Sequence, residues 1–239
     1  MTFSGCPYQQ YRDLDNPQEP VKEGLYYLAE SGKSAHLEFQ NELRSLQVDW
    51  LRLFQAPDKS KLHPKALEKL TKYNRTYDNE CIELPLCIEK YDIIAYIDAI
   101  LEEKIGDNWS GIPIPMDFKF KHFLPKIFND WVKNKRLPME KDFTQGCVYM
   151  WELTENNILG AKPQEFIIAY LNKLGLDDPT AEQEYTIDFR PELRQLIQEL
   201  LDEHLKQMVA YRDKQEITCT NKFCSNHGNE KFDLWKWVK

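Results

Sequence analysis

Apolar residues recur at the spacing of a helix in the first third of the chain. Between residues 20 and 53 they fall on one helical face, at Leu25, Leu28, Ala35, Leu37, Leu43, Leu46, Trp50 and Leu53. Gly32 interrupts this pattern, so it fits two helices as well as one. Residues 64–73 predict a further helix with Pro64 in its first turn, where proline is favoured.

The pattern changes to that of strands in the middle of the chain. Residues 81–89 alternate or run apolar, and residues 91–101 are rich in Ile and Tyr, so both predict strands joined by a short turn near Lys90. The polar residues 102–111 predict a turn or loop. Residues 112–120 then predict a third strand.

Helical spacing returns in the second half. It predicts helices at residues 122–131 and 143–154 and a long amphipathic helix at 191–211, whereas 166–174 fits a short helix or a strand. Helices, then strands, then helices predict an α/β (α+β) fold with a small mixed central sheet flanked by helices.

The length of 239 residues suits a single domain spanning 1–239. We expect a helical N-terminal part at about 20–75 and a C-terminal helix with a cysteine-containing tail at about 191–239. No apolar run approaches the roughly 20 residues that span a bilayer. The first residues have neither the basic region nor the apolar core of a secretory signal, so we expect a cytoplasmic location.

The net charge of −8 argues against a protein that coats DNA nonspecifically, which would be strongly basic. It leaves room for an enzyme that concentrates positive charge in one groove and uses acidic residues to hold a metal ion.

Three charged residues lie within the predicted strands, toward their ends. Asp98 closes the apolar segment that starts at Tyr91, and burying such a carboxylate is costly. Asp117 and Lys119 are two residues apart on the next strand, so they share one face. If the two strands pair as a hairpin, Asp98 and Asp117 approach each other.

Two neighbouring carboxylates repel unless a cation lies between them, and Mg²⁺ or Mn²⁺ prefer such oxygen ligands. A lysine beside them can hold an attacking water and stabilise charge on a phosphate. Asp98, Asp117 and Lys119 therefore suit metal-assisted phosphodiester hydrolysis. Alternatively, because Asp-x-Lys is a common tripeptide, both aspartates merely end their strands and Lys119 is an ion-pair partner.

Two further motifs flank these residues: Gly32-Lys-Ser-Ala-His36 upstream, and Gln145-Gly-Cys-Val-Tyr149 downstream, whose Gln and Tyr share a helix face. Together with Ile97-Asp98 and Asp117-Phe118-Lys119, they stand in the order found in the PD-(D/E)XK nuclease superfamily. Over residues 6–227 the chain resembles its RecB-like exonuclease branch, which includes the CRISPR-associated RecB-like nucleases. The family usually has a glycine near the position of Ala95, where this chain departs from it.

The resemblance implies a restriction-endonuclease-like core and a Mg²⁺- or Mn²⁺-dependent deoxyribonuclease, an exonuclease of DNA repair, recombination or CRISPR adaptation. It implies that the metal is bound by His36, Asp98, Asp117 and the carbonyl of Phe118. Lys119 would orient or activate the attacking water, and Gln145 and Tyr149 would contact or position the substrate. The implied partners are DNA, single-stranded or with free ends, and a helicase or CRISPR adaptation proteins.

Two alternatives stay open. The first is an inactive RecB-like protein that binds DNA or a partner. The second is a helical adaptor in which Asp-x-Lys arose by chance, and it predicts no sheet that holds Asp98 and Asp117 together.

The cysteines carry a separate hypothesis. Some RecB-like nucleases join their termini through an iron–sulfur cluster held by one early cysteine and three late ones. Here Cys6, Cys219 and Cys224 supply three thiolates, with a different spacing, where four are usual. His227 could complete the set, which would also suit Zn²⁺; alternatively the cluster has been lost. The other three cysteines are expected to pack in the core: Cys81, Cys87 and Cys147.

Overall fold

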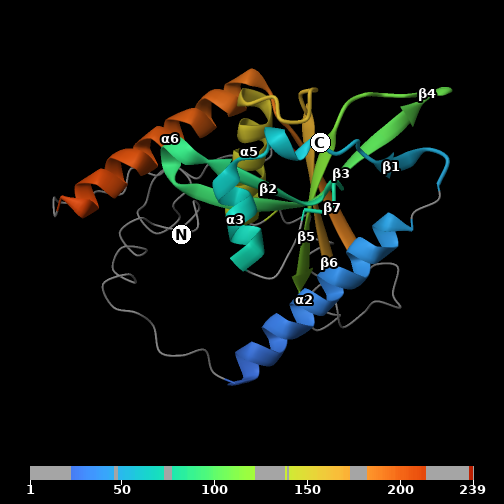
Figure 1. The fold of residues 1–239 in the computed structure, drawn as a ribbon, viewed down its shortest axis with the longest axis horizontal. Coiled ribbons are helices and arrows are strands. Elements are labelled where there is room, and N and C mark those ends of the chain that lie inside the picture. The colour runs from blue at the N-terminus through green and yellow to red at the C-terminus, as the bar shows by residue number, and fades with distance from the viewer. Residues whose placement is uncertain are drawn as a thin grey trace.

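The structure, a computed structural model, describes residues 23–45, 48–72, 77–121, 138, 140–172, 182–213 and 237–238; at residues 23–33, 121, 140, 182 and 211 it describes the backbone alone. Figure 1 shows a sheet between two groups of helices. The helices and strands are α2 (Glu23–Arg44), β1 (Leu51–Leu53), α3 (Pro64–Lys72), β2 (Ile82–Ile88), β3 (Ile93–Ile105), β4 (Asn108–Trp109), β5 (Ile114–Lys121), α5 (Glu140–Glu155), β6 (Glu165–Asn172), β7 (Glu182–Asp188) and α6 (Pro191–Arg212).

The strands form one mixed sheet in the order β1-β3-β5-β6-β7, with β2 and β4 also paired to β3. Strands β5 and β6 are parallel, and α5 lies in the connection between them, as a parallel pair requires. The other pairs are antiparallel. The predicted mixed sheet flanked by helices is confirmed.

Each face of the sheet has its own apolar core. Helix α2 covers one face, where the ring of Phe39 lies 4.4 Å from that of Phe118. Helix α5 covers the other face, where Tyr149 packs against Phe166. Helix α6 packs on α5. Figure 1 shows α2 on one side of the strands and α3, α5 and α6 on the other.

The N-terminal helical segment agrees with one of the two interpretations left open at Gly32, but it ends earlier than predicted. Helix α2 runs through Gly32 without a break. It ends at Arg44, and Leu51–Leu53 form a strand where a helix was expected. The reason is pairing with a distant strand: two leucines flank Arg52, and this alternating segment pairs with β3, where the Arg52 guanidinium reaches the Glu102 carboxylate at 2.8 Å.

The turn or loop predicted at residues 102–111 is shorter than expected. Strand β3 continues to Ile105, and β4 pairs back onto it after a turn at Gly106. Glu102 is tolerated inside the sheet because Arg52 and the amide of Gly111 both donate to its carboxylate. Asp98 therefore lies inside β3 and does not close it.

The remaining predictions divide clearly. The helices expected at 64–73, 143–154 and 191–211 are confirmed as α3, α5 and α6, and residues 166–174 contain a strand, β6. Strand β7 was not predicted. The helix expected at 122–131 lies outside the described residues. Among the described helices, none is long and apolar enough to cross a membrane. The three cysteines expected in the core are buried and carry free thiols: Cys81, Cys87 and Cys147.

Candidate functional site

The candidate site lies where β3 and β5 separate. The two strands pair from Leu101–Ile114 to Ala99–Met116, and then β3 continues along β2 while β5 continues along β6. Asp98 and Asp117 are the next residues on either strand, so they meet at the opening. At this opening the carboxylate of Asp98 accepts a hydrogen bond from the Phe118 amide at 2.7 Å. The predicted approach of the two aspartates is thereby explained.

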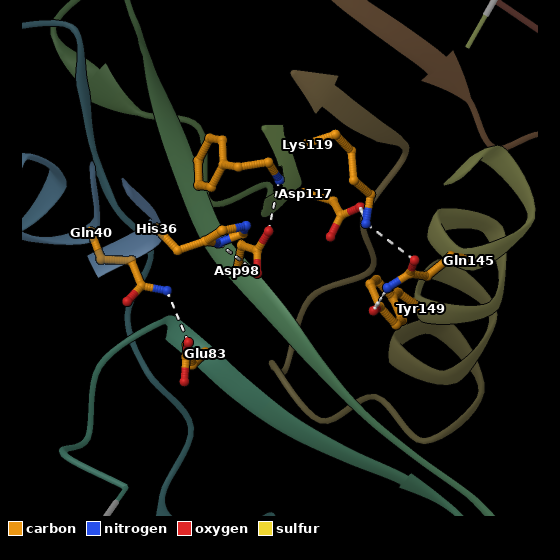
Figure 2. A network of polar contacts seen from close by, with 9 residues as sticks. His36, Gln40, Glu83, Asp98, Asp117, Lys119, Gln145 and Tyr149 are labelled. Atoms are coloured by element: carbon orange, nitrogen blue, oxygen red, sulfur yellow. Dashed lines mark hydrogen bonds and ion pairs between the residues drawn. The ribbon is translucent and has the colours of Figure 1, made fainter. Parts of the chain in front are cut away.

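Lys119 lies on the α5 face of β5, two residues beyond Asp117. Its Nζ is 2.5 Å from Asp117 Oδ2 and donates to Gln145 Oε1 at 3.1 Å. The Gln145 amide in turn donates to the hydroxyl of Tyr149. These four residues form a chain of polar contacts from β5 to α5 (Figure 2).

Gly146, the residue after Gln145 in α5, allows this helix to approach the sheet closely. A Cβ at this position would lie 2.0 Å from the ring of Phe166 on β6. Any larger residue would push α5 away from the sheet, and Gln145 would move away from Lys119.

His36 reaches the same opening from the other side. It lies on α2, its ring packs edge-on against Phe120, and its Nδ1 is 3.7 Å from Asp98 Oδ1. Figure 2 shows His36 on one side of Asp98, and Asp117 and Lys119 on the other. Groups from opposite faces of the sheet can meet here because the strands no longer pair.

Burial dominates the electrostatics of the two aspartates. It raises the pKa of Asp98 to about 6, although the Phe118 amide and the charge of Lys119 act in the opposite direction. It also raises the pKa of Asp117 to about 7, to which the neighbouring Asp98 carboxyl group adds. Burial is the largest single influence on the pKa of Lys119 and would lower it, but the charge and hydrogen bond of Asp117, together with the charges of Asp142 and Asp98, outweigh burial and the pKa is raised. Burial, more than repulsion between the two carboxylates, therefore raises the pKa values of both aspartates.

A divalent cation fits this donor set. Asp117 is 2% exposed, and its Oδ2, though close to the Lys119 ammonium, makes no well-formed hydrogen bond with any residue that the structure describes. Oxygen donors of buried carboxylates and an imidazole suit Mg²⁺ or Mn²⁺. In the part of the chain that the structure describes, no three His, Cys, Asp or Glu side chains already converge as a cage.

Three nearby residues were missed from the sequence. Gln40, one turn after His36, donates to Glu83 Oε1 at 3.1 Å, and the charge of Glu83 contributes to the raised pKa of Asp98. Asp142, one turn before Gln145, is buried and accepts a hydrogen bond from the Tyr170 hydroxyl at 2.7 Å. The available signals were helical spacing from His36 and Gln145, and an acid inside an apolar strand.

Glu83 has an unusual backbone. Its φ of 49° is in the left-handed region, which costs a residue with a side chain about 1–3 kcal/mol. Backbone strain of this kind is often found at functional sites, and Glu83 lies beside Asp98.

The structure thus brings together the predicted His36, Asp98, Asp117, Lys119, Gln145 and Tyr149. Phe118 was predicted to contribute its carbonyl to a metal ion, which stays a prediction, and its amide donates to Asp98. The predicted cluster ligands lie outside the described residues: Cys6, Cys219, Cys224 and His227.

No protein-family model matches this chain, and no curated protein matches it.

Proposed function

We propose that this protein is a metal-dependent deoxyribonuclease of the RecB-like branch of the PD-(D/E)XK superfamily, with a restriction-endonuclease-like core. One observation carries the proposal: Asp117, which is buried, and Asp98, whose side chain is 14% exposed, meet at the opening between β3 and β5 with Lys119 beside them. Two neighbouring carboxylates whose pKa values are raised favour a bound cation, and a lysine next to that cation suits phosphodiester hydrolysis.

The metal ligands would be Asp98, Asp117, His36 and the carbonyl of Phe118. A bound Mg²⁺ or Mn²⁺ would lower the pKa of a water molecule and offset the charge of the scissile phosphate. Asp98 contributes a carboxylate whose orientation is already fixed by the Phe118 amide. His36 contributes a nitrogen from the opposite face of the sheet.

Lys119 would hold the attacking water and stabilise the charge that develops on the phosphate. Gln145 accepts a hydrogen bond from Lys119 Nζ and so helps to hold the ammonium in place. Tyr149 accepts from the Gln145 amide and orients it. Lys119 is thus held from both β5 and α5.

The finer assignments follow from the resemblance. The protein would be an exonuclease that acts on DNA that is single-stranded or has free ends. It would work beside a helicase or CRISPR adaptation proteins. An iron–sulfur cluster or Zn²⁺ would be bound by Cys6, Cys219, Cys224 and His227. Pure protein that is brown, with an absorption band lost on reduction, would support the cluster.

The test is cleavage of end-labelled single- and double-stranded DNA with Mg²⁺ or Mn²⁺. We expect wild-type protein to cleave and Asp117→Asn to lose at least about 10²-fold in rate. Asp202→Asn is the matched control, because it removes the carboxylate of another Asp–Lys pair far from the site. Wild-type protein that cleaves nothing with any metal would contradict the proposal. If it binds DNA all the same, the inactive DNA-binding alternative is supported.

A further inference from the structure

Helix α2 presents one face to the sheet, with side chains spaced three and four residues apart: His36, Phe39, Gln40 and Leu43. Most of its contacts are apolar. Phe39 packs on Phe118, and Leu43 lies in a cluster with Ile82. Such contacts are not directional, so they favour burial of this face without fixing how far the helix slides or turns.

Gln40 makes a directional contact on this face. It is 4% exposed, although glutamine is mostly found at protein surfaces, and its Nε2 donates to Glu83 Oε1 at 3.1 Å. A buried hydrogen bond of this kind is costly to leave unmade, so it defines one position of α2 over β2.

The backbone of β2 explains how Glu83 reaches α2. Ile82 packs in the core under α2, whereas Leu84 packs in the core under α5. In a regular strand these two residues would share a face. The left-handed backbone of Glu83 lies at the point where the strand changes faces, and it leaves the Glu83 side chain directed at Gln40.

The strand register completes the arrangement. Ile82 pairs with Ala99 and Leu84 with Ile97, so Glu83 stands opposite Asp98. On α2, His36 and Gln40 are separated by one turn. Two neighbours on the helix thus contact two neighbours on the sheet, His36 with Asp98 and Gln40 with Glu83 (Figure 2).

We propose that Gln40 and Glu83 are a positioning pair, whose hydrogen bond holds α2 in the one placement that keeps the His36 imidazole against the Asp98 carboxylate. This inference rests on the proposed function, in which His36 and Asp98 bind the metal ion. Glu83 acts through its hydrogen bond, and its negative charge is not required.

The test is calorimetric titration of Mn²⁺ into the metal-free full-length protein. We expect Gln40→Met and Glu83→Met each to weaken Mn²⁺ binding about 10-fold, in the range found when partners of metal ligands are removed. Glu83→Gln keeps an oxygen that accepts from Gln40, so we expect a dissociation constant within about 3-fold of wild type. A general loss of packing would not separate Glu83→Met from Glu83→Gln in this way.

The matched control is Glu80→Gln. Glu80 pairs with Arg44 at 2.6 Å, one turn further along α2, and this ion pair is exposed. We expect Mn²⁺ binding to be unchanged. If Gln40→Met does not fold, Gln40→Asn serves in its place, because its amide is one methylene short of Glu83 and should give a similar loss.

Two outcomes would overturn the inference. If Glu83→Gln loses as much as Glu83→Met, the charge of Glu83 acts directly at the metal. If Gln40→Met and Gln40→Asn both bind Mn²⁺ as wild type does while His36→Ala binds weakly, Gln40 positions nothing. Failure of the proposed function is distinct, because wild-type protein would then bind no Mn²⁺ and His36→Ala would change nothing.

Discussion

Two aspartate–lysine pairs in this protein have similar geometry and opposite electrostatics. Asp117 lies 2.5 Å from Lys119 in the opening between β3 and β5, and Asp202 on α6 lies 2.7 Å from Lys90 in the turn before β3. The pKa of Asp117 is raised to about 7, mainly by burial. The pKa of Asp202 is lowered to about 2, mainly by hydrogen bonds from Lys90, Tyr91 and Gln198.

The pKa values of the two aspartates differ because Asp202 accepts more hydrogen bonds than Asp117 and is more exposed to water. The Asp202 side chain is 41% exposed and accepts from the Tyr91 hydroxyl at 2.6 Å and the Gln198 amide at 2.9 Å. Asp117 is almost fully buried, with Asp98 as a like-charged neighbour. The pair at Asp202 is complete as it stands and ties α6 to the β2–β3 turn. The pair at Asp117 lacks positive charge, as expected of a site that binds a cation.

The largest expected contrast is in DNA cleavage by the two lysine variants. Lys119→Met removes the ammonium next to the reacting phosphate, and we expect the rate to fall by about 10²–10³-fold. Lys90→Met removes the matching ammonium on the surface, and we expect cleavage within about 2-fold of wild type. Equal effects in a gel-based cleavage assay with Mn²⁺ would mean that Lys119 is structural.

The second contrast is in the pH dependence of stability of the metal-free protein. The folded-state pKa of Asp98 is raised, so its stabilising contribution is present below about pH 4 and is lost as the pH rises through about 6. Asp98→Asn keeps an acceptor for the Phe118 amide. We expect its free energy of unfolding at pH 8 to exceed that of wild type by about 1 kcal/mol or more. The advantage should shrink toward pH 4 and also on adding Mn²⁺ to the wild-type protein.

Asp202→Asn should behave in the opposite way. The folded-state pKa of Asp202 is lowered, so its contribution is present above about pH 4 and is lost as the pH falls toward about 2. We expect this variant to be less stable than wild type by up to about 1 kcal/mol at pH 7, with the deficit shrinking below pH 4. Urea unfolding between pH 3 and pH 8 measures both; parallel pH profiles for the two variants would remove the distinction between the pairs.

The smallest contrast is between two tyrosine hydroxyls. Tyr149→Phe removes the acceptor of the Gln145 amide, and we expect a loss of about 3–10-fold in cleavage, the size of one neutral hydrogen bond. Tyr91→Phe removes a donor to Asp202, and we expect unchanged cleavage with about 1 kcal/mol less stability. If Tyr91→Phe were the one that impaired cleavage, the role given to the α5 face would be wrong.

The sequence predicted the parts of the site that depend on local periodicity. Alternation placed Asp117 and Lys119 on one strand face, and helical spacing placed Gln145 and Tyr149 on one helix face. Both arrangements are confirmed, because side-chain direction within a strand or helix is fixed by backbone geometry.

What the sequence did not predict depends on contacts between distant segments. The polar residues after Leu101 looked like a loop because Arg52, the partner that allows Glu102 to be buried, lies on another strand. The separation of β3 from β5 at Asp98 is set by which neighbour each strand pairs with. The change of faces at Glu83 depends on a left-handed backbone that glutamate rarely adopts, so no local pattern announces it.

The most direct test of the metal centre is titration calorimetry of Mn²⁺ into metal-free protein at pH 6.5, in two buffers of different ionisation enthalpy. Because the carboxyl groups of Asp98 and Asp117 have pKa values of about 6 and 7, cation binding should release protons. We predict Mn²⁺ binding whose apparent enthalpy depends on the buffer, lost in Asp117→Asn and retained in Asp202→Asn. Absence of Mn²⁺ binding, or binding that Asp117→Asn leaves unchanged, would contradict the assignment of a metal centre to Asp98 and Asp117.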